Sequence, residues 1–70
     1  MKTMRQLRLE RGMTQKELAV LLGVTHRTIA GAELGYWRPR PRTMKAIADA
    51  LGVQIVDVRE FAAAIQDEAA

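Results

Sequence analysis

The stretch "TQKELAVLLGVTHRTIAGAELG", residues 14–35, predicts two short helices that follow each other closely. Thr14, with a glutamate three residues later, fits a capping box and predicts a helix that begins there. Leu18 and Leu22 mark the buried stripe of this helix. Gly23 fits the left-handed C-cap conformation and predicts where the helix ends.

A second helix follows almost at once. Thr25 predicts its N-terminus and Gly35 its C-terminus. The linker "GVT" (23–25) is too short to let the two helices run antiparallel side by side, so they must cross at a steep angle. This is the geometry of a helix-turn-helix.

Outward from this pair, the apolar spacing stays helical. We expect three further helices, from Met4 to Gly12, from Pro41 to Gly52 and from about Val56 to Ile65. No strand pattern or repeat interrupts them. The sequence therefore predicts a single all-α domain over residues 1–70, with five short helices of which the second and third form the helix-turn-helix.

Composition and charge limit the classes of protein to which this sequence can belong. With no cysteine and 49% hydrophobic residues, packed helices must stabilise the 70-residue chain. No apolar run approaches the roughly 18 residues of a membrane span, and no signal peptide is visible, so we expect a cytoplasmic protein.

The charge is unevenly distributed along the chain. Residues 1–45 carry ten basic and three acidic side chains, a net +7, whereas residues 46–70 carry one basic and five acidic side chains, a net −4. The basic part predicts a polyanionic partner, although an unevenly charged, solvated surface is the plain alternative.

The helix pair resembles that of the lambda-repressor/Cro family, also called the XRE family. The matching residues are Thr14, Gln15, Leu18, Ala19, Gly23, Val24, Thr25, Ile29, Glu33 and Gly35. The similarity extends to Arg8, Gly12, Pro39 and "AIADALGV" (46–53). It covers about residues 4–58 and leaves 59–70 as the end of the fifth helix and a tail. The resemblance implies a lambda-repressor-like DNA-binding domain of bacterial, phage or plasmid type, whose third helix enters the major groove.

With Ile29 facing the core, 100° per residue places Arg27, Ala30, Gly31 and Leu34 on the outer side of the third helix. Arg27 has the forked donors that pair with guanine O6 and N7. The resemblance places Gln15 where family members touch a phosphate or orient a base contact. The predicted DNA-binding residues are Gln15, Thr25, His26, Arg27, Thr28, Gly31, Trp37, Arg38 and Arg40.

Two members of this set leave alternatives open. Gly31 costs the helix roughly 0.5–1 kcal/mol relative to alanine. We interpret it as allowing close approach of the helix backbone to DNA; alternatively, the position touches nothing and tolerates glycine. Trp37 either supports the neighbouring arginines at the DNA backbone or closes the core of this small domain.

Two further pairs have structural roles. Arg8 and Glu33 resemble the family's buried ion pair between the first and third helices. A physical argument supports the pairing: Glu33 lies within roughly 40° of Ile29 on the helical wheel and would bury an unpaired charge if it had no partner. Phe61 and Ile65 extend beyond what a four-helix core needs and predict a dimer interface; the alternative is that they pack back on the first helix.

The chain has no serine, cysteine or asparagine, and its single histidine has no base–orienter pair. We therefore expect no enzyme, no metal site and no cofactor. We expect a transcriptional regulator, in particular a repressor, that binds a double-stranded DNA operator as a homodimer. The main alternative is an antitoxin or another module that binds a protein partner through the same fold. A third interpretation is a DNA-binding accessory protein that activates or assists recombination.

Overall fold

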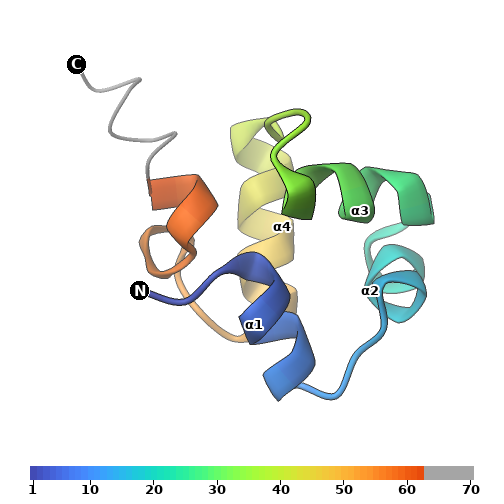
Figure 1. Cartoon of the computed structure of the whole chain (residues 1–70), viewed down its shortest axis with the longest axis horizontal. Helices are drawn as coiled ribbons and strands as arrows, with labels where there is room; N and C mark the ends of the chain where they lie inside the picture. Colours follow the sequence, from blue (N-terminus) through green and yellow to red (C-terminus); the bar gives the residue numbers. More distant parts are fainter. Residues whose placement is uncertain (63–70) are drawn as a thin grey trace.

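A computed structural model describes residues 1–62 of the chain (Figure 1). Its helices are α1 (Met4–Glu10), α2 (Gln15–Leu22), α3 (His26–Leu34) and α4 (Pro41–Leu51), followed by the 3-10 turn η1 (Ile55–Asp57). Residues 59–62 are also helical and lie where the fifth helix was expected. The described residues contain no strand. The predicted all-α architecture with five helices is confirmed.

Capping boxes fix the N-termini of α1 and α2. At α2, the Thr14 hydroxyl accepts a hydrogen bond from the N–H of Glu17 (3.0 Å), and the Glu17 carboxylate accepts one from the N–H of Thr14 (2.9 Å). The backbone N–H and the hydroxyl of Thr14 together hold the pKa of Glu17 below its usual value. Because the charged carboxylate is the acceptor, this cap stabilises α2 near neutral pH and weakens as the pH falls through the pKa of Glu17.

The turn between α2 and α3 depends on Gly23. Its φ of 70° lies in the left-handed region, which glycine adopts without a steric penalty. The N–H of Val24 then donates to the carbonyl of Ala19 over 3.0 Å, a bond typical of a Schellman motif. Thr25 caps α3 by accepting a hydrogen bond from the N–H of Thr28 over 3.3 Å. The chain thus passes from α2 to α3 within the three residues that the sequence predicted.

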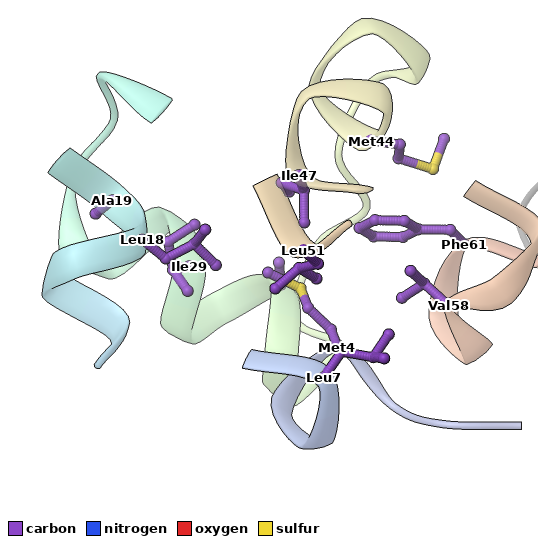
Figure 2. Close-up of a cluster of buried hydrophobic side chains, with 11 residues drawn as sticks. Met4, Leu7, Leu18, Ala19, Ile29, Met44, Ile47, Leu51, Val58 and Phe61 are labelled. Atoms are coloured by element: carbon purple, nitrogen blue, oxygen red, sulfur yellow. The ribbon is translucent and has the colours of Figure 1, made fainter. Parts of the chain in front are cut away.

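The core lies where α4 meets the other helices. In Figure 1, α4 runs vertically through the middle of the molecule, whereas α3 lies across the view. The buried side chains come from all four α-helices and from the C-terminal segment (Figure 2): Met4, Leu7, Leu18, Ala19, Ile29, Ala32, Met44, Ile47, Leu51, Val58 and Phe61. Because each helix supplies only two or three of them, each is stable only when packed against its neighbours.

The C-terminal segment differs from the continuous helix that we predicted. After η1, Val58 is extended, with φ −96° and ψ 119°. This conformation buries the Val58 side chain completely and lets the N–H of Arg59 donate to the carbonyl of Lys2 over 2.9 Å. The N–H of Met4, in the first turn of α1, donates to the Glu60 carboxylate over 3.0 Å. These bonds join residues near the N-terminus to the segment after η1.

Phe61 lies in the core instead of the predicted dimer interface. The residue is 1% exposed, and Figure 2 shows its ring between Met44 and Val58, pointing toward Leu51. A side chain that its own chain encloses has no surface to offer a second copy, so the predicted interface through Phe61 is wrong. Its predicted partner in that interface, Ile65, lies outside the described residues.

Arg8 and Glu33 form the predicted ion pair between α1 and α3. The contact is bidentate: Nε of Arg8 lies 2.7 Å from Oε2 of Glu33, and Nη2 lies 3.2 Å from Oε1. Both side chains are buried, at 6% and 3% exposed. Nη1 of Arg8 also donates to the carbonyl of Met13 over 2.7 Å. Charge-assisted bonds of this kind offset the cost of removing both charges from water, and they attach α3 to α1 and to the loop before α2.

Phe61→Ala is expected to lower the free energy of unfolding by about 3–5 kcal/mol, because it removes a fully buried ring. Since the ring packs within one chain, the loss should be the same at all protein concentrations, whereas the loss of a dimer contact would shrink on dilution. Urea unfolding at two widely separated concentrations measures it. Val56→Ala, at a position that is 51% exposed, is the control. If the loss of unfolding free energy depends on protein concentration, Phe61 contributes to a dimer interface after all.

Arg8→Met should lower the free energy of unfolding by about 3–5 kcal/mol, because it leaves the Glu33 carboxylate buried without its partner. The double variant Arg8→Met/Glu33→Leu should recover much of this loss but not all, since the carbonyl of Met13 and the amide of Gln15 still lose a partner. Urea denaturation of the double-mutant cycle gives the coupling. As a control, Lys2→Met removes an exposed ion pair and should cost less than about 1 kcal/mol. Strictly additive losses would contradict the pairing.

Candidate nucleic-acid interface

The first turn of α3 presents two exposed side chains, His26 and Arg27. Ile29, which is fully buried, holds the opposite side of the same turn in the core. Thr28 and Ala30 are half-buried at the edges of the exposed face. The N-terminal residues of a recognition helix are those that reach base edges in a helix-turn-helix. His26 and Arg27 are therefore exposed at the end of the helix where the sequence predicted contacts to DNA.

Thr25 and Thr28 are bonded to each other at the start of α3. Their hydroxyl oxygens lie 3.1 Å apart, and Oγ1 of Thr25 also accepts the capping bond from the N–H of Thr28. These bonds fix both side chains beside the helix terminus, where unpaired N–H groups carry partial positive charge. The exposed Thr25 hydroxyl is thus near a phosphate-attracting end of the helix, whereas Thr28 mainly supports the cap.

Gln15 connects the start of α2 with the start of α3. Its amide nitrogen donates to Oε1 of Glu33 over 3.0 Å, and its Oε1 lies 2.8 Å from Nε2 of His26. Together with the Arg8–Glu33 pair, these bonds form a continuous chain from a buried guanidinium to an exposed imidazole. The sequence placed Gln15 among residues that touch or orient a DNA contact; the structure adds which groups it links.

Gly31 does not lie on the exposed face where the sequence placed it. It is buried, and a Cβ built on it would lie 2.7 Å from Cδ1 of Trp37 and closer still to Nε1. The turn at Gly35 brings Trp37 back over α3, with the N–H of Tyr36 donating to the carbonyl of Gly31 over 3.0 Å. Glycine therefore makes room for an indole of its own chain. Both expectations, close approach to DNA and a position that touches nothing, are wrong.

Trp37 covers α3 and is not part of the central core. Its side chain is 40% exposed, whereas the neighbouring Tyr36 is 80% exposed. Trp37 is absent from the buried core, so the alternative that it closes the core is met only in part, by the packing of its indole against Gly31. Because 40% of the residue is exposed, a DNA contact through Trp37 stays a prediction.

Basic side chains follow in the loop from α3 to α4. Arg38 and Arg40 are exposed on either side of Pro39, which is buried and anchors the loop. Arg40 is the N-cap residue of α4 and makes no side-chain capping bond. Arg42, in the first turn of α4, is exposed as well. The predicted set left Arg42 out, although its spacing of two residues from Arg40 was a signal for including it.

The chemistry of this surface consists of hydrogen-bonding groups and positive charges. Within residues 1–62, no group of three or more histidine, aspartate or glutamate side chains is placed to hold a metal ion. No helix in the described part of the chain has the length and apolar character needed to cross a membrane. The exposed donors suit contacts to phosphates and base edges.

Gly31→Ala is expected to displace the indole of Trp37, because the added methyl overlaps the ring. Trp37 is the only tryptophan, so a red shift of the intrinsic fluorescence reports this displacement. In a Trp37→Ala background, the same substitution should stabilise the domain by up to about 1 kcal/mol through helix propensity, a gain that the overlap offsets in the parent. Urea denaturation compares the two backgrounds. Equal gains in both, with unchanged emission of Gly31→Ala, would show that the methyl and the indole do not meet.

Known proteins share this arrangement. Residues 4–58 match the profile of the helix-turn-helix family HTH_3. No curated protein matches the sequence. Among solved structures, the chain is similar to the clp gene regulator ClgR from Corynebacterium glutamicum, with 27% sequence identity and a TM-score of 0.76, over 94% of this chain and 71% of that one. The family match includes both helices of the α2–α3 pair. The chain therefore belongs to the lambda-repressor/Cro-like (XRE) family of helix-turn-helix DNA-binding regulators.

Proposed function

We propose that the chain reads a specific double-stranded DNA operator with α3 in the major groove and acts as a repressor in the cytoplasm. The observation that carries this proposal is the first turn of α3, where His26 and Arg27 are exposed while Ile29 fixes the turn in the core. The similarity to ClgR, a gene regulator, supports a role in transcription. Repression is the simplest outcome, since occupying a site requires no further surface.

The proposed contacts divide into those that specify sequence and those that position the protein. Arg27 would pair with the O6 and N7 atoms of guanine, because its guanidinium offers two parallel donors. Arg38 and Arg40 would neutralise phosphates beside the C-terminal end of α3. Thr25 and Gln15, at the starts of α3 and α2, would lie near phosphates that the helix termini attract.

A homodimer would double these contacts by placing two copies of α3 one helical turn apart on the DNA. The interface would not include Phe61, which its own core encloses. Leu34 and Tyr36, which are 65% and 80% exposed, are apolar side chains at the C-terminal end of α3 that such an interface would use instead. Sedimentation of the chain with a two-site duplex tests the stoichiometry.

Arg27→Ala is expected to weaken binding to a selected operator by about 1–3 kcal/mol and binding to random DNA far less, because it removes a base contact. Arg40→Ala should weaken both equally and flatten the plot of log K against log salt by about 0.9, the contribution of one phosphate. Arg59→Ala makes the same change of charge in the C-terminal segment. It should alter neither the affinity for the two DNAs nor the slope of the salt plot. Fluorescence anisotropy on operator and random duplexes, at several salt concentrations, measures all three variants.

Two outcomes would contradict the proposal at different points. Equal losses on both DNAs for Arg27→Ala would remove this arginine from base reading. Absence of salt-dependent DNA binding by the parent would remove the DNA function itself and favour the protein-partner alternative. Val20 and Leu21, exposed at 81% and 62% on α2, would then be the first positions to test for partner binding.

A further inference from the structure

The hydrogen-bond chain that ends at His26 fixes the direction of each of its bonds. Its inner end is the buried Arg8–Glu33 pair, in which Glu33 receives two bonds from the guanidinium. A carboxylate held in this way accepts hydrogen bonds and donates none. The Gln15 atom that lies 3.0 Å from Oε1 of Glu33 must therefore be the amide nitrogen.

This constraint passes outward to the imidazole. With its nitrogen directed at Glu33, Gln15 turns its carbonyl oxygen toward His26, 2.8 Å from Nε2. An amide oxygen only accepts, so Nε2 of His26 must carry a hydrogen. A neutral imidazole has a single N–H, which leaves Nδ1 with a lone pair. Gln15 thus selects the tautomer of the exposed His26 side chain.

Nδ1 of His26 is available for an external partner. His26 is the first residue of α3 and is exposed. Within residues 1–62 its ring makes one hydrogen bond, from Nε2 to Gln15, and none at Nδ1. Arg27, the next residue, offers donors only. The first turn of α3 therefore places an acceptor beside a donor, two groups of opposite hydrogen-bonding character.

We propose that His26 is a specificity-determining residue that accepts a hydrogen bond through Nδ1 and selects a base with an exocyclic amino group, adenine or cytosine, at one operator position. In the major groove, adenine N6 and cytosine N4 donate, whereas guanine and thymine present acceptors there. An acceptor that faces another acceptor leaves both unpaired and desolvated, which disfavours guanine and thymine. This inference rests on the proposed function and adds the class of base that is read.

The polarity can be measured in the free protein, without DNA. His26 is the only histidine, so the ring nitrogen signals in a 15N NMR spectrum belong to it alone. At a pH where the imidazole is neutral, we expect the hydrogen on Nε2, in a higher proportion than in an unconstrained histidine. Gln15→Met, which keeps the length of the side chain but not its amide, should lower that proportion. If the hydrogen is on Nδ1, or if its position does not respond to Gln15→Met in a folded variant, the hydrogen-bond chain does not set the tautomer of His26.

The base preference is tested with the full chain. Selection from random duplexes, repeated with His26→Ala and Arg27→Ala, identifies the position whose preference disappears only in His26→Ala; we expect adenine or cytosine there. A duplex in which that base lacks its amino group should then bind the parent at least about fivefold more weakly. His26→Ala should lose less by the same change. Any weakening of the base pair itself is common to both proteins and cancels in this comparison.

The outcomes separate this inference from the proposed function. A preference for guanine or thymine at the His26 position, or equal losses for both proteins on the modified duplex, would overturn the role of Nδ1 while a selected DNA sequence left the proposed function standing. Failure to enrich any sequence would instead overturn the proposed function, and the NMR measurement would still decide the polarity of the imidazole.

Discussion

The position of α3 depends on the buried ion pair between Arg8 and Glu33. A helix of nine residues is not stable alone, so contacts from outside must hold it. The pair attaches α3 to α1 with two bonds, and through Gln15 it also attaches α3 to the start of α2. Because both charges are out of contact with water, a shifted α3 would leave an uncompensated charge inside the protein. We therefore expect the pair to disfavour shifted positions of α3.

Three sides of α3 are occupied by the protein itself. Ile29 packs into the core, Glu33 faces α1, and Gly31 lies under the indole of Trp37. Only the side chains of the first turn and those near the C-terminal end stay exposed. If α3 reads DNA as proposed, this short surface has few groups with which to discriminate between bases, so the direction of each exposed hydrogen-bonding group would matter. In this fold, the hydrogen bond from Gln15 orients the imidazole of His26.

The features that the sequence predicted correctly are those that local chemistry determines. Thr14 and Gly23 set the bounds of α2 through bonds within a few residues, and the helical wheel placed Glu33 close enough to Ile29 to require a buried partner. Gly31 and Phe61 were misplaced for a different reason. The wheel gives the direction of a side chain from its own helix, but it does not show that the following turn brings Trp37 back over α3. An apolar stripe on a helix likewise does not show whether its residues pack in the core of their own chain or at an interface between two chains.

The bonds between residues 2–4 and 58–60 affect the order in which the domain assembles. The N–H of Met4 and the carboxylate of Glu60 are 56 residues apart in sequence, so a long loop must close before they meet. α2 and α3 pair across a turn of three residues and can form earlier. Because Met4, Val58 and Phe61 are fully buried, these contacts also complete the core of the domain. We therefore expect the closing of this loop, which buries Val58 and Phe61, to be a late step of folding that follows the pairing of α2 with α3.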